Sequence, residues 1–129
     1  MYLVGVDIGG TKISAGLVKG KIVVRKIREP VKKVKKDFLK QIIDIIEWCV
    51  KGIDRKKIKG IGMGVPGPAD YEKGLIANPP NLKQLWNVNI KKVIQGRFKI
   101  KTRIDNDVHV IAIAERNFGF GRKLRNFVV

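Results

Sequence analysis

The chain has 129 residues, of which 44% are hydrophobic, so it is long and apolar enough for one folded domain with a core. It has no apolar run that could span a bilayer, and its one cysteine, Cys49, has no partner for an internal disulfide. We see no signal peptide, and these features together predict a cytoplasmic protein without a membrane anchor.

Basic residues dominate the charge of the chain. Lys and Arg number 28 against 11 Asp and Glu, which gives a formal net charge of +17. The positive electrostatic field of such a chain attracts nucleic acids and the phosphates of nucleotides. The lysines are spread along the chain, however, and the one local run, at residues 32–36, has no interleaved aromatic residues on which bases would stack. A solvated, lysine-rich surface therefore explains the charge better than a nucleic-acid interface does.

The first half of the chain predicts three antiparallel strands and a helix. Residues 2–8, 12–18 and 21–27 are strand-like and are joined by short turns. From residue 35 onward, apolar side chains recur at helical spacing as far as Val50, and a glycine then ends the helix.

The second half of the chain predicts alternating strands and helices around a long loop. The elements expected there are, in chain order, a buried strand at 58–65, a loop with a short hairpin at 69–88, a helix from Asn89 to about Gly96, a strand at 98–104, a largely buried helix at 106–118 and the start of a strand at 126–129. Helices that return the chain to one sheet predict an α/β fold with a mixed sheet.

The first hairpin has the residue types that suit a bound phosphate. Gly9 and Gly10 let backbone amides approach an anion, and Thr11 and Lys12 add a hydroxyl group and a positive charge. Asp7 would repel a bare phosphate, so its position favours a Mg²⁺ ion between the two, bound directly or through water. The two glycines alone would indicate an ordinary turn, whereas the whole VDIGGTK stretch favours a phosphate site.

A second polar cluster, Asp105-Asn106-Asp107, lies at a predicted strand-to-helix junction, where ligands often bind in open sheets. A helix cap is a sufficient explanation for Asp105. Asn106 could hold sugar hydroxyls, and Asp107 could accept the proton of a hydroxyl that attacks phosphorus. Gly67, in the stretch GVPGPAD, and Asn81 either line the same cleft or only shape and pack a loop.

Four stretches, in order along the chain, resemble the ROK family of sugar kinases and repressors: DIGGTK, GIGMGVPGPAD, PNLKQLW and IDNDVHVIAIAE. That family belongs to the actin, Hsp70 and hexokinase superfamily. The resemblance implies a ribonuclease H-like (actin-like ATPase) lobe, an α/β structure with a mixed five-stranded sheet and helices on both faces. It also implies a glucokinase-like enzyme that uses ATP and Mg²⁺ to phosphorylate the 6-hydroxyl of glucose or a related hexose.

The resemblance also implies roles for particular residues. The cofactor-binding residues would be Asp7, Gly9, Gly10, Thr11 and Lys12, with Asp7 also serving Mg²⁺. The hexose-binding residues would be Gly67, Asn81, Asn106 and Asp107, with Asp107 as the catalytic base. Family members often have Glu-Asn-Asp-Ala-Asn where this chain has Asp105-Asn106-Asp107-Val108-His109. For His109, packing or capping near the helix start explains the residue better than an acid–base role.

The largest departure from the family concerns its second lobe. That lobe carries a second glycine-rich phosphate motif, further sugar ligands and the adenosine pocket, and none of these occurs in the present sequence. We therefore expect residues 1–129 to be a single amino-terminal lobe that has negligible kinase activity alone. Its partners would be a hexose and either a carboxy-terminal lobe or another copy in a homo-oligomer.

Two alternative functions are left open. One is a ROK-type regulatory, sugar-binding protein, which as a repressor would need a DNA-binding segment before the first strand, where Met1 leaves no room. The other is a nucleic-acid-binding protein or metal-dependent nuclease on a ribonuclease H-like scaffold, using Asp7, Asp105 and Asp107 with two metal ions. The net charge favours the nuclease, whereas the Asn106-Asp107 pair and the PGPAD and PNL stretches do not, because a nuclease has no need of them.

Overall fold

The computed structural model describes residues 1–70, 72–79 and 81–128. Its strands and helices, in chain order, are β1 (Tyr2–Ile8), β2 (Lys12–Lys19), β3 (Ile22–Pro30), α1 (Lys35–Val50), β4 (Ile58–Val65), β5 (Ala69–Asp70), β6 (Leu75–Ile76), α2 (Ile90–Phe98), β7 (Thr102–Asn106) and α3 (Asp107–Phe118). Short 3₁₀ turns occupy Arg55–Lys57, Lys83–Leu85 and Phe120–Lys123.

Five strands form one mixed sheet in the order β3-β2-β1-β4-β7. Strands β1, β2 and β3 pair antiparallel, and β4 pairs parallel with both β1 and β7. In this register Asp7 lies beside Gly64, and Gly64 lies beside Asp105. The carboxyl ends of three parallel strands therefore meet at one end of the sheet, which confirms the predicted mixed sheet and places the polar clusters together.

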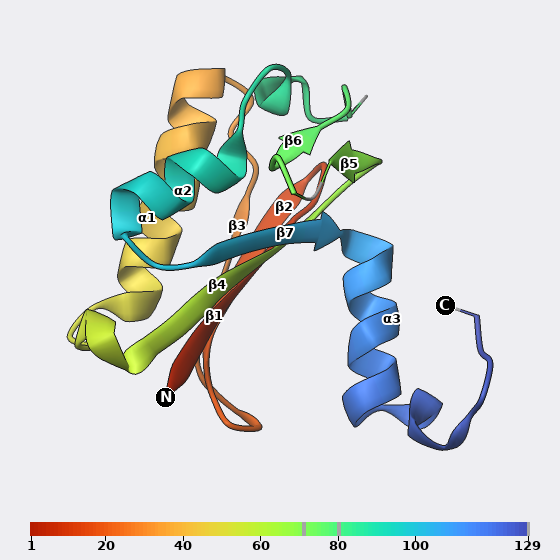
Figure 1. Ribbon diagram of the computed structural model, residues 1–129. Coiled ribbons are helices and arrows are strands. Elements are labelled where there is room, and N and C mark those ends of the chain that lie inside the picture. The colour runs from red at the N-terminus through yellow and green to blue at the C-terminus, as the bar shows by residue number, and fades with distance from the viewer. Residues whose placement is uncertain (71, 80, 129) are drawn as a thin grey trace.

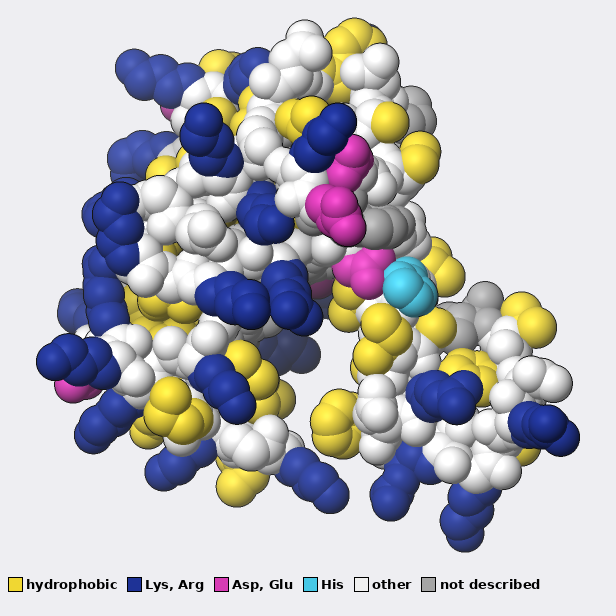
Figure 2. Space-filling model, viewed as in Figure 1, with side chains coloured by type: hydrophobic (Ala, Val, Ile, Leu, Met, Phe, Trp, Pro, Cys, Tyr) yellow, Lys and Arg dark blue, Asp and Glu magenta, His cyan; other side chains and the backbone are white. Residues whose placement is uncertain are grey.

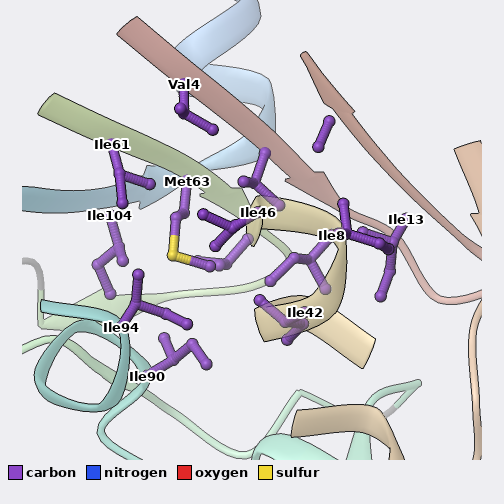
Figure 3. Close-up of a cluster of buried hydrophobic side chains, with 14 of the residues drawn as sticks. Val4, Ile8, Ile13, Ile42, Ile46, Ile61, Met63, Ile90, Ile94 and Ile104 are labelled. Carbon is purple, nitrogen blue, oxygen red and sulfur yellow. The ribbon is translucent and has the colours of Figure 1, made fainter. Parts of the chain in front are cut away.

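The hydrophobic core lies between one face of the sheet and the helices α1 and α2 (Figure 1). Alternate residues of β1, namely Val4, Val6 and Ile8, are buried on this face, as expected for a strand with one covered side. Figure 3 shows side chains of the sheet, among them Ile8, Met63 and Ile104, facing isoleucines of both helices. Phe38 of α1 and Phe98 of α2 are completely buried, so both helices are held to the sheet by large apolar side chains.

The carboxyl end of α1 is held by an arginine from the edge of the sheet. The half-buried Arg25 of β3 donates from Nη1 to the carbonyl oxygens of Cys49 (3.0 Å) and Lys51 (2.6 Å). The last turn of α1 has no basic residue of its own. Arg25 therefore satisfies carbonyl groups that a helix end leaves without intrahelical partners.

The opposite face of the sheet carries α3 at one end and is otherwise left open by the described residues (Figure 1). All residues of α3 are described, and none of their side chains is buried. The prediction of a largely buried helix at 106–118 is therefore wrong in its burial, although the helix itself is confirmed. Apolar residues such as Val108, Ile111 and Ile113 favour burial, but α3 leaves the sheet at an angle (Figure 1), and its main contacts are with β4, β7 and the turn that follows it.

Three other predicted boundaries can be compared with the structure. The helix after Asn89 extends to Phe98 and ends where Lys99 adopts a left-handed conformation (φ 56°), so the following strand begins at Thr102 rather than at residue 98. Asn89 does cap α2, accepting from the N–H of Lys92 at 2.9 Å, and the short hairpin β5–β6 is present. Residues 126–128 do not form a strand, and residue 129 lies outside the described residues.

No helix in the described part of the chain is long and apolar enough to cross a membrane. Basic side chains are distributed over much of the visible surface, as Figure 2 shows, rather than collected in one patch.

Candidate functional site

The bend between β1 and β2 is held tightly by its own backbone. The N–H of Gly9 donates to the carbonyl oxygen of Lys12 at 2.9 Å. A Cβ atom added at Gly9 would lie only 3.0 Å from that oxygen, so the bend leaves little room there for any residue but glycine. The carbonyl oxygen of Thr11 accepts from the N–H of Val31, which ties the bend to the end of β3. Thr11 and Lys12 are exposed, so their side chains are accessible to a ligand.

The second glycine of the bend packs against a distant loop. A Cβ added at Gly10 would lie 3.3 Å from Cβ of Asn81. The next residue, Leu82, is completely buried and anchors this loop to the core. The fold thus brings together the predicted phosphate bend and the predicted loop amide, which are 71 positions apart (81 − 10).

Asp7 and Asp107 lie close to one another beside Gly64 of β4. A Cβ added at Gly64 would be 3.7 Å from Oδ1 of Asp7, 3.6 Å from Cα of Asp107 and 3.9 Å from Cβ of Asp107. The pKa of Asp7 is raised above its usual value. The main cause is partial burial, which takes water away from the carboxylate, and the second cause is the negative charge of Asp107. Arg28 opposes this effect in part. Two neighbouring carboxylates that repel each other form a site that favours a cation.

Asn106 connects α3 to the loop that follows β4. Its Nδ2 donates to the carbonyl oxygen of Gly67 at 3.0 Å. Its Oδ1 accepts from the backbone N–H groups of Val108 (3.0 Å) and His109 (3.3 Å). Asn106, rather than Asp105, is therefore the N-cap of α3, which corrects the prediction of Asp105 as a cap. An amide nitrogen has two hydrogens, so Asn106 retains one for a ligand.

Asp107 begins α3 and points one oxygen at the backbone. Its Oδ1 accepts from the N–H of Val108 at 2.8 Å. A carboxylate has a second oxygen with further lone pairs, which can accept the proton of a hydroxyl group. The geometry therefore fits a carboxylate that is oriented by one oxygen and reactive through the other.

The sequence did not indicate that Asp105 and His109 contact each other. Nδ1 of His109 lies 2.9 Å from Oδ1 and 2.8 Å from Oδ2 of Asp105. The signal that could have predicted this contact is their spacing of four residues across the start of a helix, where such side chains are neighbours.

An apolar cavity of about 560 Å³ opens beside these residues, between the open sheet face and α3. Figure 2 shows the surface hollowed between α3 and the rest of the molecule. Its polar lining includes Asp7, Asp105, Lys26 and Arg103, and Val110 contributes from α3. Among the residues that the structure describes, no three His, Cys, Asp or Glu side chains form a group that could hold a metal ion.

The strand order, the two helices on one face and the cluster at the carboxyl ends of β1, β4 and β7 define an α/β lobe of the ribonuclease H-like, actin-like ATPase class. The chain belongs to the ROK family, whose family model matches residues 3–129. The predicted family and the predicted fold class are both confirmed.

Three similar proteins show the range of this family. A glucokinase from Thermotoga maritima is 33% identical over 125 residues, which cover 95% of this chain and 38% of the relative. A xylose repressor from Caldicellulosiruptor bescii is 36% identical over 97 residues, covering 73% of this chain and 24% of the repressor. The crystal structure of a ROK family glucokinase from Streptomyces griseus, in complex with glucose and AMPPNP, matches with a TM-score of 0.84 at 24% identity, covering 95% of this chain and 38% of that chain.

The chain thus spans less than two fifths of the length of these relatives. They include two glucokinases and a xylose repressor.

Proposed function

We propose that this chain is the amino-terminal lobe of a ROK sugar kinase, which transfers a phosphoryl group from ATP to the 6-hydroxyl of glucose or a similar hexose. The observation that carries the proposal is the convergence of Asp7 and Asp107 beside Gly64, between the hairpin bend and the Asn106 turn. Phosphoryl transfer depends mainly on the positioning of the two reactants and on charge stabilisation. A site that supports this transfer must therefore have two parts close together. One is a phosphate side, which binds the phosphates of ATP, and the other is a hexose side, which binds the hydroxyl group that accepts the phosphoryl group.

The phosphate side would be formed by the bend. Gly9 uses its own N–H to close the turn, so the following amides, of Gly10 and Thr11, are the ones we assign to the phosphates. Lys12 adds a positive charge, and Asp7 would hold Mg²⁺ directly or through water. The position of both Asp7 and Asp107 beside Gly64 fits a bound cation. Such an ion, when bound, neutralises charge on the phosphates.

The hexose side would be formed by Gly67, Asn81, Asn106 and Asp107. Asn106 would donate its remaining amide hydrogen to a sugar hydroxyl while its other contacts keep the amide in place. Asp107 would accept the proton of the attacking hydroxyl through its second oxygen. Asn81, which packs against Gly10, would connect the hexose side to the phosphate side.

The rest of the enzyme would come from a second lobe. The match to the Thermotoga maritima glucokinase leaves more than half of that protein without a counterpart in these 129 residues. We assign residues 1–129 to a single amino-terminal lobe that requires a carboxy-terminal lobe, or a second copy in a homo-oligomer, for turnover. Negligible hexose phosphorylation by the chain alone, in a coupled assay, is the expected result.

Ligand titration of the isotopically labelled chain tests this proposal directly. MgATP should shift the backbone signals of Gly10 and Thr11, and glucose should shift those of Gly67 and the side-chain amide of Asn106. Ribose, which lacks the 6-hydroxymethyl group, serves as the matched control sugar. Equal shifts with ribose and glucose, or shifts confined to the surface lysines, would refute a hexose site.

A second candidate function is a regulatory sugar-binding protein. The similarity to the Caldicellulosiruptor bescii xylose repressor favours it. The two functions differ in the need for a base, because binding a sugar does not require a proton acceptor at its reacting hydroxyl. Asp107→Asn keeps hydrogen-bonding capacity, so it should preserve sugar binding in either case. With a carboxy-terminal lobe added, hexose phosphorylation that disappears in Asp107→Asn supports the kinase, and binding without turnover supports the regulator.

A further inference from the structure

The Asp105–His109 contact has no part in the proposed chemistry. Its two residues lie on either side of Asn106 and Asp107, to which we assign hexose binding and proton transfer. Asp105 precedes Asn106 and Asp107 at the end of β7, and His109 follows them in the first turn of α3. Both oxygens of Asp105 lie within 2.9 Å of Nδ1 of His109. His109 is the only histidine of the sequence.

The contact completes a ring of hydrogen bonds around the turn between β7 and α3. Oδ1 of Asp105 also accepts from the N–H of Asn106 at 2.7 Å. Oδ1 of Asn106 in turn accepts from the N–H groups of Val108 and His109. The ring is joined to the neighbouring loop where Nδ2 of Asn106 donates to the carbonyl oxygen of Gly67. A displacement of the His109 ring would therefore be transmitted to the amide of Asn106.

The chemistry of the pair defines which nitrogen of His109 carries hydrogen. An ionised carboxylate can only accept hydrogen bonds, so Nδ1 must be the donor, whether the imidazole is neutral or charged. The side chains of Asp105 and His109 are 27% and 59% exposed, and an ion pair so accessible to water adds little to global stability. The effect of the pair is therefore local, on the geometry of the turn.

We propose that His109 is a positioning residue: held by Asp105, it fixes the turn that aims Asn106 and Asp107 at the hexose. This inference rests on the proposed function, because the hexose is the ligand that these two residues would bind. The chain departs from the Glu-Asn-Asp-Ala-Asn pattern at both position 105 and position 109, and the two replacements contact each other.

Nuclear magnetic resonance of the nitrogen-labelled chain tests the positioning role without any ligand. The single imidazole should be in the form with hydrogen on Nδ1. Asp105→Ala and His109→Ala should each shift the side-chain amide signals of Asn106. Asp105→Ala also removes the acceptor of the Asn106 N–H, so the coupling shows in one comparison: adding His109→Ala to Asp105→Ala should shift these signals no further. Arg116→Ala, an exposed change on the same helix, is the control that should leave these signals unchanged.

The affinity for glucose is the second readout. His109→Ala should raise the Kd for glucose about two- to tenfold, the loss expected for one hydrogen bond, while the midpoint of unfolding stays at the wild-type value. His109→Asn should recover much of the affinity, because the Nδ2 of asparagine lies near the place of the histidine Nδ1.

Two results would overturn the positioning role: hydrogen on Nε2 with Nδ1 bare, or Asn106 signals in His109→Ala that match those of the wild type. Unchanged glucose affinity in His109→Ala would overturn it as well. If the wild-type chain binds no glucose, the proposed function fails instead, and the Asn106 signals alone decide whether His109 positions the turn.

Discussion

Asp7 and Asp107 are 100 positions apart in the sequence (107 − 7) and lie beside the same glycine, Gly64, at the end of β4. The negative charge of Asp107 contributes to the raised pKa of Asp7, so the two carboxylates influence each other electrostatically. Glycine at position 64 leaves the space between them without a side chain.

Gly64→Ala should therefore disrupt the site while sparing the fold. The added methyl group would contact Asp7 Oδ1 and the Cα of Asp107 at ordinary van der Waals distances of 3.7 and 3.6 Å, so little change in the free energy of unfolding is expected. It would occupy the space that a bridging ligand needs, and binding of MgATP, measured by calorimetry, should be lost. Gly62→Ala is the matched control, because an added Cβ there meets nothing within 4 Å. Equal affinity in both variants would show that no ligand lies between the two carboxylates.

Asp7→Asn should make the fold more stable near neutral pH. Because the pKa of Asp7 in the folded chain is raised above its usual value of 3.8, the folded state holds the proton more tightly than the unfolded state does. The stabilisation from this group is fully present below pH 3.8 and is lost as the pH rises through the folded-state pKa. The asparagine variant should thus have a higher Tm than the wild type at pH 7, and the difference should shrink on acidification. A lower Tm at pH 7 would contradict this electrostatic account.

Arg25→Ala should lower the free energy of unfolding by about 1 to 2 kcal/mol, because it removes the donor that reaches the carbonyl oxygens at the end of α1. Unfolding in urea, followed by circular dichroism, measures the change. Lys21→Ala, an exposed change in the turn before the same strand, should differ little from the wild type. Equal losses in the two variants would mean that charge, rather than the cap, accounts for the effect of Arg25.

Gln41→Leu tests the connection between the sheet edge and α1. The buried amide of Gln41 donates to the carbonyl oxygen of Pro30 at 2.8 Å and accepts from the N–H of Lys32 at 3.0 Å. Leucine preserves the apolar packing but leaves these backbone groups unpaired, at a cost of about 1 to 3 kcal/mol in urea unfolding. Lys40→Ala removes only an exposed ion pair with Asp44 and should cost much less. The prediction fails if Gln41→Leu is as stable to urea as Lys40→Ala.

Much of the fold could be predicted from local patterns. The strand at 58–65 coincides with β4 because its apolar residues and the surrounding turn residues define it without reference to the rest of the chain. The burial of α3 could not be predicted in this way. Apolar residues on most sides of a helix show what the side chains favour, but only the path of the whole chain determines whether another element covers them.

In the candidate site, too, single residues could be predicted from the sequence, whereas the contacts between segments could not. The motifs drew attention to Asp7, Gly10, Asn106 and Asp107 individually, because those residue types at turns and strand ends suit phosphates and hydroxyls. Contacts between segments, such as Gly10 against Asn81, depend on how loops are placed by the core and leave no trace in local spacing.

The exposure of α3 has a consequence for the two halves of the site. The bend with Gly9 and Gly10 joins β1 and β2 at the centre of the sheet, and the hydrogen-bonded amides of these strands should exchange with solvent slowly. α3 is 12 residues long with no buried side chain, and a helix of that length is marginal without packing. The backbone amides of α3 should exchange far sooner than those of the strands. Asp107 would then lie on a helix that unfolds locally at a small cost in free energy. Anything that docks on α3 would then also order the acidic half of the site.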